Sequence, residues 1–438
     1  MRSKSLKGKV EARISDVSAD PVCEFYTSHP YPPPVENLDR LRDAWQAENP
    51  NRAEYHLLWP DKKYRSDLDV LVAGCGTWQA AKYALCHPDA RVVGIDVSPT
   101  SLEHTETLKR KYKLTNLVTR QLPIENVAKL DQRFDLIVCT GVLHHLVDPD
   151  VGLRALRSVL RSEGAMYLMV YAPYGRTGVY MLAEYCRRLG IGTSKEEIQD
   201  LTAVLEVLPQ HHPLVATLRG SRDSLNAEAL VDALLNPRDR AYSVPELFDF
   251  IERNELMLGR WYWQAPYLPQ CGLIAETPHA SRLVALPERE QYMAMELWRG
   301  LMNIHSFVVY RSDMNNDGLK LRFDDERYLR YVPIRLPWTI CVQEGLPAGV
   351  SGVLLNQTHV FDDLMLFIDA REKRMFEAID GRRSISEILD KVKEKPTSPL
   401  FFKKLWWHDQ VVFDTSMTAR AKSNARSATQ GKVIRTKR

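Results

Sequence analysis

Between residues 69 and 171, short apolar runs alternate with stretches whose apolar residues recur at helical spacing. One of these stretches begins at Ser98 and Pro99, a pair typical of a helix N-terminus because serine caps free amides and proline has none to satisfy. Strands that alternate with helices favour a doubly wound α/β fold with a mostly parallel sheet and right-handed crossovers. The predicted strands are Val70–Ala73, Arg91–Ile95, Asn116–Thr119, Phe134–Cys139 and Ala165–Tyr171.

The regions outside this pattern differ from it in composition. Residues 1–66 are polar and proline-rich around His29–Pro34, which predicts an extended arm that can lie over a surface. Leu, Ala and Glu recur at helical spacing over residues 178–256, so we expect a helical insertion there. The predicted organisation is an N-terminal arm or lid at 1–66, an α/β domain at 67–280, a small α+β accessory domain at 281–415 and a disordered basic tail at 416–438.

The charge is unevenly distributed along the chain. The 438 residues include 45% hydrophobic and 26% charged residues, which excludes global disorder. The formal net charge is +3, yet residues 420–438 carry seven Lys or Arg and no acid. The rest of the chain therefore has a net charge of about −4, which does not favour a body that binds nucleic acid.

The seven cysteines are scattered, and none forms a CxxC pair. This spacing excludes a disulfide framework and a standard structural zinc site, and it indicates a reducing compartment. The first 16 residues lack the apolar segment of a signal peptide. No apolar run approaches the roughly 20 residues that span a bilayer. We therefore expect a cytoplasmic protein that has no membrane partner.

Two glycines mark the turn between the first predicted strand and the helix that follows it. Gly74 and Gly76 lack a Cβ, so their backbone can approach a ligand at the carboxyl end of the sheet. Asp96 ends the second strand, the expected place for a carboxylate that accepts hydrogen bonds from ribose hydroxyls. Dinucleotides and S-adenosylmethionine both fit this arrangement. A dinucleotide fingerprint, however, would have a third glycine where Gln79 stands.

Three segments resemble the class I S-adenosylmethionine-dependent methyltransferases. They are Val72–Thr77 around the glycines, Gly94–Ser98 around the carboxylate and Phe134–Leu146 at the fourth strand. The resemblance extends from Asp69 to about Arg176. It implies a Rossmann-like fold with a mostly parallel seven-stranded sheet, S-adenosyl-L-methionine as the cofactor and methyl transfer as the activity.

The resemblance also implies cofactor contacts. The glycine turn would line the methionine and ribose, and the carboxylate after the second strand would hold the ribose hydroxyls. The segment after the third strand would flank the adenine, and the segment after the fourth would approach the sulfonium. Two positions depart from the family pattern, because Val72 replaces a common acid and Trp78 a common third glycine. The implied cofactor-binding residues are Gly74, Cys75, Gly76, Asp96, Val97, Gln121, Leu122, Gly141 and Val142.

Two histidines follow the fourth strand at the edge where acceptors bind. An imidazole of His144 or His145 could take the proton of a hydroxyl acceptor or stabilise a carboxylate acceptor. A base is needed only if the acceptor keeps its proton, because the sulfonium donor is already activated and positioning supplies most of the acceleration. The alternative is that one histidine packs in the core and the other caps a turn. We predict His144, His145 and Tyr171 as catalytic residues, and no metal site.

Other side chains near the expected acceptor pocket allow a functional and a structural interpretation. Arg176 could pair with an acidic acceptor or stand exposed in a loop. His211 and His212 have no third ligand at a metal-binding spacing, which favours a polar turn. Tyr26 and Tyr31 in the proline-rich arm resemble the lid of many small-molecule methyltransferases.

The C-terminal unit carries a second resemblance. A helix at Asp362–Ile379, two further helices and a strand at Val411–Phe413 follow the order of winged-helix or PqqD-like modules. From Arg282 to Asp414 there are 19 basic and 20 acidic residues, which leaves no basic excess for nucleic acid. PqqD-like modules recognise peptides, so the resemblance implies a peptide or protein partner. Structural packing is the alternative.

These observations predict an S-adenosylmethionine-dependent methyltransferase that acts on a small-molecule or peptide acceptor. Nucleic acid is disfavoured as the acceptor, and the C-terminal domain would bind a protein partner. The alternative is a non-catalytic scaffold or regulator that keeps the cofactor fold and carries a peptide-binding C-terminal module.

Overall fold

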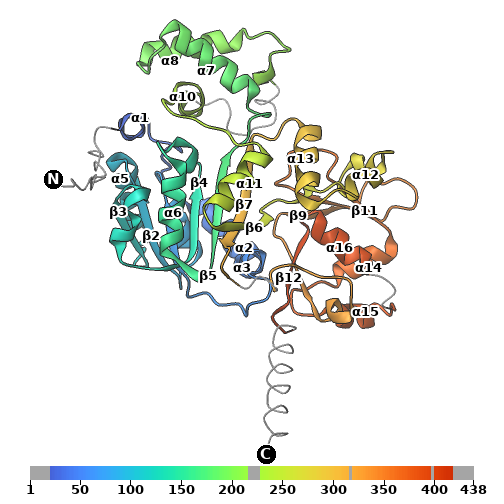
Figure 1. Cartoon of the computed structure of the whole chain (residues 1–438). Helices are drawn as coiled ribbons and strands as arrows, with labels where there is room; N and C mark the ends of the chain where they lie inside the picture. Colours follow the sequence, from blue (N-terminus) through green and yellow to red (C-terminus); the bar gives the residue numbers. More distant parts are fainter. Residues whose placement is uncertain (1–19, 216–226, 315–317, 396–398, 418–438) are drawn as a thin grey trace, which may run out of the picture.

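A seven-stranded sheet forms the centre of the protein (Figure 1). The computed structural model describes residues 20–215, 227–314, 318–395 and 399–417. The strand order is β3-β2-β1-β4-β5-β7-β6, and β7 runs antiparallel to both of its neighbours while the other pairs are parallel. The predicted mostly parallel seven-stranded sheet is thus confirmed. The strands are β1 (Asp69–Ala73), β2 (Arg91–Asp96), β3 (Leu117–Gln121), β4 (Phe134–Thr140), β5 (Leu160–Tyr171), β6 (Leu256–Trp261) and β7 (Ile304–Arg311).

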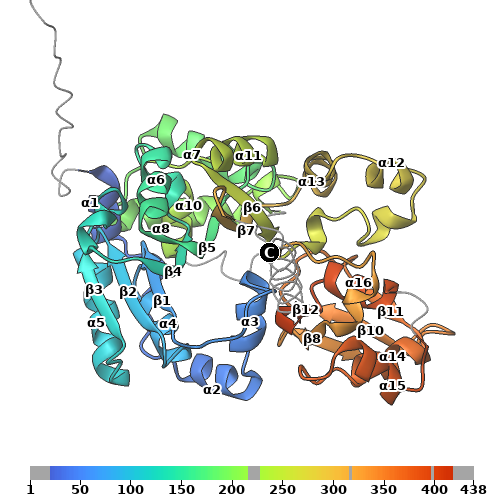
Figure 2. The same cartoon turned by 60° about the horizontal axis from the view of Figure 1, so that its bottom comes forward.

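Helices cover both faces of this sheet (Figure 2). Ser98 accepts a hydrogen bond from the amide of Ser101 (3.2 Å), so it caps the helix that begins at Pro99, as the sequence predicts. The fifth strand begins earlier than predicted, because Leu160 already pairs with Phe134. The covering helices are α4 (Gln79–Cys86), α5 (Pro99–Tyr112), α6 (Pro149–Val159) and α11 (Val244–Arg253).

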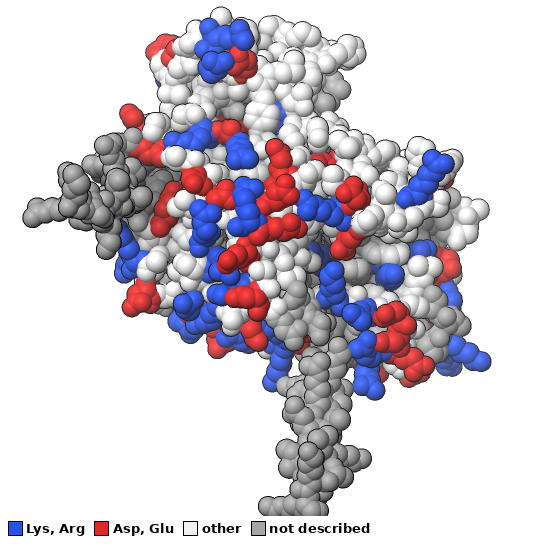
Figure 3. Space-filling view, in the orientation of Figure 1, with Lys and Arg blue, Asp and Glu red and all other residues white. Residues whose placement is uncertain are grey.

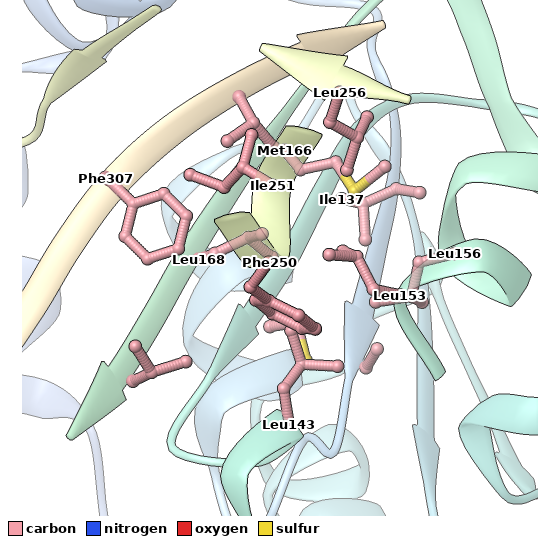
Figure 4. Packing of buried hydrophobic residues seen from close by; sticks show 14 of the residues in the cluster. Ile137, Leu143, Leu153, Leu156, Met166, Leu168, Phe250, Ile251, Leu256 and Phe307 are labelled. Carbon is pink, nitrogen blue, oxygen red and sulfur yellow. The ribbon is translucent and has the colours of Figure 1, made fainter. Parts of the chain in front are cut away.

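The helices α6 and α11 pack their apolar stripes on one face of the sheet. Figure 4 shows Leu153 and Leu156 of α6 and Phe250 and Ile251 of α11 converging on strand residues such as Ile137. All five side chains are at most 1% exposed. Burial of each such side chain contributes about 1.5–3 kcal/mol, so this layer holds the strand ends in place.

β7, the strand of this sheet that comes last in sequence, lies beyond the predicted domain boundary at residue 280. β7 pairs with β5 from Met166↔Val309 to Tyr171↔Ile304, and it also pairs with β6. α12 (Ala280–Val284) and α13 (Glu288–Arg299) lead into it. A division of the chain at residue 280 would therefore cut through the sheet.

Helices stand where the sequence predicts the insertion, above the carboxyl edge of the sheet in Figure 1. They are α7 (Thr177–Leu189), α8 (Lys195–Glu206) and α10 (Ala227–Leu235), and residues 216–226 lie outside the described part. Their own apolar cluster consists of Val179, Leu182, Cys186, Leu201, Leu214, Leu230 and Leu234. The insertion thus packs partly on itself.

The N-terminal arm is more helical than its proline content predicts. It contains α1 (Pro21–Ser28), α2 (Asp39–Glu48) and α3 (Asn51–Leu58). Proline is compatible with the first turn of α1, where Asp20 accepts a hydrogen bond from Val22 (2.8 Å) and supplies the cap. The prediction of an extended arm is therefore wrong for most of the described residues of 20–66, although the stretch around residues 29–38 is not helical.

In the described part of the C-terminal region, two small sheets are accompanied by the α-helices α14, α15 and α16. The helices α15 and α16 and the strand β12 stand where the sequence predicts them, but the predicted helix at Asp362–Ile379 is wrong in its first half. Leu366–Ile368 pairs as a strand with β10, and the helix begins only after its cap, Asp369. The elements are β8 (Val332–Arg335), β9 (Thr339–Val342), β10 (Gly352–Asn356), β11 (Leu366–Ile368), α14 (Ala370–Glu377), α15 (Ile385–Lys391), α16 (Leu400–Trp407) and β12 (Val411–Asp414).

A buried charge connects the C-terminal region to the sheet. Asp409 is fully buried, pairs with Arg260 of β6 at 3.2 Å and accepts a hydrogen bond from the amide of Ala265 (2.9 Å). Removing one partner of such a pair costs about 3–5 kcal/mol. The two regions therefore hold each other in one arrangement. Short 3₁₀ helices complete the described chain at Ile124–Leu130, Leu143–His145, Ala265–Tyr267, Leu273–Glu276 and Glu326–Arg330.

The surface carries both signs of charge. On the face in Figure 3, basic and acidic side chains are interspersed. Several of them form ion pairs, such as Arg253 with Asp150 at 2.6 Å. Within the described residues, no helix has the length and apolar character needed to cross a bilayer.

Candidate active site

The glycine turn between β1 and α4 lies against the loop that follows β4. Gly74 and Gly76 have φ angles of +69° and +54°, in the left-handed region that favours glycine. The amides of Gly74 and Cys75 both donate to the carbonyl of Ile95, which fixes the turn against β2. A Cβ on Gly74 would lie 2.4 Å from Cγ2 of Val142, so a larger residue would push the two loops apart.

Asp96 ends β2 beside this turn. Its two carboxylate oxygens accept hydrogen bonds from the amides of Gly76 (2.8 Å) and Ser98 (2.9 Å). Burial raises the pKa of Asp96, and these backbone hydrogen bonds oppose the rise. A carboxylate oxygen has two lone pairs, so the group can still accept hydrogen bonds from two hydroxyls.

The N-terminal arm closes over the glycine turn. The carbonyl of Pro32 accepts a hydrogen bond from Thr77 Oγ1 (2.7 Å), and a Cβ on Gly76 would lie 3.0 Å from Pro32 Cδ. Ser98 Oγ donates to the carbonyl of Tyr26 (3.0 Å). The arm therefore lies at the place where a lid over the cofactor would lie.

The remaining predicted cofactor residues lie at the same edge of the sheet. Gly141 and Val142 follow β4, and Val142 faces the glycine turn. The amide of Leu122 and the side-chain nitrogen of Gln121 donate to the carbonyls of residues 96 and 97, at 2.9 and 3.1 Å. The fold thus brings together the four predicted segments 74–76, 96–97, 121–122 and 141–142.

The two departures from the family pattern are accommodated by packing. Val72 is fully buried in the middle of β1. Trp78 is half-buried and packs against the apolar cluster on the face covered by α4. Both side chains thus contribute to the sheet domain's core.

The two predicted histidines lie side by side in the 3₁₀ helix after β4. The ring of His144 lies 4.2 Å from that of His145 and 3.9 Å from that of Tyr171. Among the described residues, neither ring nitrogen of His144 has a hydrogen-bond partner. Burial lowers the pKa of His144 well below its usual value, so this imidazole is neutral.

His145 is held differently. Its Nδ1 lies 2.6 Å from the carbonyl oxygen of Arg238. Because a carbonyl only accepts hydrogen bonds, the neutral ring carries its proton on Nδ1 and keeps the lone pair on Nε2. No described residue bonds to this Nε2.

A buried carboxylate that the sequence does not reveal joins the arm to the insertion. Asp232 of α10 accepts hydrogen bonds from Tyr26 (2.7 Å) and Tyr171 (3.3 Å), and Asn236 donates to the Tyr26 hydroxyl (3.0 Å). Burial raises the pKa of Tyr26 and of Tyr171 well above the usual value, so both hydroxyls keep their protons. No sequence pattern could have found Asp232, because its partner Tyr26 is 206 positions away.

Arg176 is buried rather than exposed in a loop. Its guanidinium lies 3.5 Å from the centre of the Tyr171 ring and pairs with Asp239 at 3.1 Å. Within the described residues, Nε of Arg176 and Oδ1 of Asp239 have no hydrogen-bond partner. The hydrogen-bonding capacity of these two buried atoms is used by no described residue.

Potential metal-ligating atoms of His144, His145 and Asp239 lie within 4.8 Å of one another. The guanidinium of Arg176, which pairs with Oδ2 of Asp239, would lie beside a cation bound there. His212 lies elsewhere, in a turn where its Nδ1 accepts a backbone amide (3.1 Å).

Residues 71–166 match the family model described as a methyltransferase domain. This range includes the glycine turn, Asp96 and the histidine pair. The chain therefore carries a methyltransferase domain, and the predicted enzyme class is confirmed together with its cofactor, S-adenosylmethionine.

Relatives share different parts of the chain. An uncharacterized protein from Synechococcus sp. is 26% identical over 74% of this chain and 78% of its own length. Malonyl-[acyl-carrier protein] O-methyltransferase from Acetivibrio thermocellus is 27% identical over 33% of this chain and 50% of its own length. tRNA U34 carboxymethyltransferase from Shewanella denitrificans is 33% identical over 31% of this chain and 44% of its own length. The chain thus spans about half the length of these two relatives with named activities.

A solved structure shares the fold over most of the chain. PKMT2 from Rickettsia typhi has a TM-score of 0.60 at 15% identity, covering 89% of this chain and 75% of that one. Its complex with AdoHcy has a TM-score of 0.57 and covers 83% of this chain. The comparisons do not support the predicted likeness of the C-terminal unit to winged-helix or PqqD-like modules. In that unit a three-stranded antiparallel sheet, absent from the predicted order, precedes the helices.

Proposed function

We propose that this chain transfers the methyl group of S-adenosylmethionine to a nucleophile that carries a proton, and that His145 takes up that proton. The observation that carries the proposal is the fixed tautomer of His145. Its Nδ1 is tied to the carbonyl of Arg238, and its Nε2 keeps a free lone pair at the carboxyl edge of the sheet. A neutral imidazole held in this way is suited to act as a general base.

The cofactor residues named above supply the second half of the proposal. The cofactor brings an activated methyl group, so the protein has to bind it, align the acceptor and accept a proton. Gly74 and Gly76 form the turn beside which the cofactor's methionine end would lie, and Asp96 can hold the ribose hydroxyls. Val97, Gln121 and Leu122 would flank the adenine. Cys75, Gly141 and Val142 complete the binding edge.

The acceptor in this proposal is a small molecule or the end of a peptide side chain. The hydrogen bond between Tyr26 and Asp232 closes the site, and the ring of Tyr26 lies 6.0 Å from that of His145. A nucleic-acid duplex would not fit beneath such a bridge. A cavity of about 400 Å³ opens beside the site and is lined by Tyr180 and Asp239, among others. His144 and Tyr171 would form the floor against which the acceptor is aligned.

Calorimetry with S-adenosylmethionine and S-adenosylhomocysteine tests the cofactor side. We expect both to bind the parent protein, and we expect Asp96→Ala to abolish measurable binding because the ribose hydroxyls lose their acceptor. Asp43→Ala, which removes an exposed carboxylate on α2, is the matched control and should bind like the parent. Failure of the parent to bind either compound would contradict the proposal.

Transfer of a labelled methyl group to components of a cell extract tests the activity. A labelled product that disappears in His145→Gln supports the proposed base. Cofactor binding without any labelled product would instead favour the alternative of a non-catalytic scaffold.

A further inference from the structure

A second cavity lies on the face of the sheet covered by α3 and α4. Figure 2 shows the helix α4 beside β1. Its volume is about 110 Å³, and none of its lining residues belongs to the active site described above. Val70, Leu136 and Tyr167 of the central strands form its floor. Seven side chains of its lining carry aromatic or imidazole rings: Tyr55, Trp59, Tyr64, Tyr83, His87, Tyr167 and Tyr262.

Ring-to-ring contacts hold this wall in place. Tyr167 stacks on Tyr262 with ring centres 4.3 Å apart, and Tyr83 stacks on His87 with ring centres 5.6 Å apart. Nδ1 of His87 lies 3.1 Å from the carbonyl of Tyr83, which fixes the orientation of the imidazole. The rings are thus oriented before any ligand arrives, which reduces the entropy that binding would cost.

The cavity also has an excess of negative charge. Glu54 projects into it from α3 with a side chain 19% exposed, and its nearest basic atom is Nε2 of His87 at 3.7 Å. Within the described residues, no Lys or Arg forms an ion pair with Glu54 or with Asp89, the other lining acid. Arg65 is the one Lys or Arg in the lining, and Asp135 already neutralises it at 2.5 Å.

The carboxylate of Glu54 acts on the aromatic hydroxyls around it. Burial raises the pKa of Tyr83 and of Tyr262 well above the usual value, and the charge of Glu54 adds to both shifts. All three side chains line the same cavity.

We propose that this cavity binds an organic cation, with an alkylammonium head against the tyrosine rings and its charge balanced by Glu54. Aromatic faces attract cations through the ring quadrupole, and a partly buried carboxylate that pairs with no described Lys or Arg strengthens that preference. An anion would meet two carboxylates, and a neutral ligand would leave both uncompensated. The small volume fits a compact head such as a trimethylammonium group.

Calorimetry on the full-length protein tests this with choline and with its neutral isostere, 3,3-dimethyl-1-butanol. We expect choline to bind and the alcohol to bind at least about tenfold more weakly, because only the cation gains from Glu54 and the rings. Glu54→Gln should weaken choline binding about tenfold or more, whereas Glu48→Gln on the exposed side of α2 should leave it unchanged.

A second pair of variants covers the case in which Glu54→Gln fails to fold. Tyr262→Phe keeps the ring and should bind choline like the parent, and Tyr262→Leu removes the ring and should not. No choline binding at millimolar concentration, equal binding of the alcohol, or unchanged binding in Glu54→Gln would each overturn the proposal. S-adenosylmethionine binding, measured in parallel, should be unaffected by Glu54→Gln, which separates this cavity from the active site.

Discussion

The two sides of the active site are built in different ways. The centre of the proposed cofactor side consists of glycines, backbone amides and one carboxylate from residues that are close in sequence, Gly74 to Ser98. The acceptor side consists of side chains from four distant segments, which meet at Asp232 and Tyr171. On the proposed assignment, cofactor binding would depend on local backbone geometry, whereas acceptor binding would depend on how the arm and the insertion pack.

A substitution at the glycine turn should have the largest effect on the cofactor side. In Gly74→Ala, the new Cβ would lie 2.4 Å from Val142. The alanine would also have to adopt the positive φ of this position. We expect loss of S-adenosylmethionine binding and a free energy of unfolding lower by about 2–4 kcal/mol. Chemical denaturation and calorimetry measure the two effects.

Gly190→Ala is the matched control for this prediction. Gly190 has a similar φ of +64°, but nothing lies within 4 Å of its added Cβ. It should cost only the roughly 1–2 kcal/mol of the left-handed backbone and leave cofactor binding intact. Equal losses in both variants would show that the close contact with Val142 is unimportant.

A substitution on the acceptor side should slow methyl transfer and leave cofactor binding intact. We expect His145→Gln to slow labelled methyl transfer by about 10²–10⁴-fold, the usual contribution of a general base. S-adenosylmethionine affinity should stay unchanged, because His145 contacts Arg238 and not the glycine turn. His279→Gln, at an exposed histidine, is the control. A parallel loss of cofactor affinity in His145→Gln would mean that the two sides are not separate.

Acidification should lower the free energy of unfolding because His144, on the acceptor side, is buried in its neutral form. Its pKa is lowered by burial, whereas the same histidine in the unfolded chain takes up a proton near pH 6.5. Below that pH the unfolded state binds the extra proton, so stability falls between pH 6.5 and 5 by up to about 1.4 kcal/mol per pH unit. Chemical denaturation of His144→Phe at pH 7, 6 and 5 should show a smaller slope than the parent, and an identical slope would refute the assignment.

A substitution that breaks the hydrogen bond between Tyr26 of the arm and Asp232 of the insertion should have the smallest effect on stability and cofactor binding. Tyr26→Phe removes one of the hydrogen bonds that Asp232 accepts, which costs about 1–2 kcal/mol. Because the same arm covers Gly76, we expect S-adenosylmethionine to dissociate about fivefold faster in stopped-flow experiments. Tyr185→Phe, on the exposed side of α7, should dissociate at the parental rate.

Local patterns explain which parts of the molecule could be predicted from sequence. Buried strand runs, the turn at Gly74 and the carboxylate at Asp96 each depend on neighbours along the chain. Asp232 and Asp239 carry no such signal, because their partners come from β5, its following loop and the arm. Arg176 looks like a loop residue in the sequence, and only the folded chain places it against Tyr171.

The strand β7 escaped prediction for a related reason. His305 and Ser306 interrupt its apolar run, and two helices separate it from the rest of the sheet domain. The three short strands of the C-terminal sheet, β9 to β11, have only three to five residues each, too few for an alternating pattern to stand out.

The position of β7 has a consequence for the order in which the protein can form during synthesis. β5 leaves the ribosome more than a hundred residues before the strand that will cover its edge, and β6 has no partner in the sheet other than β7 among the described strands. Until residue 311 has emerged, the nascent chain presents an open strand edge, which other chains can pair with. The sheet is therefore completed only after α12 and α13 have been made, shortly before the C-terminal strands that follow β7.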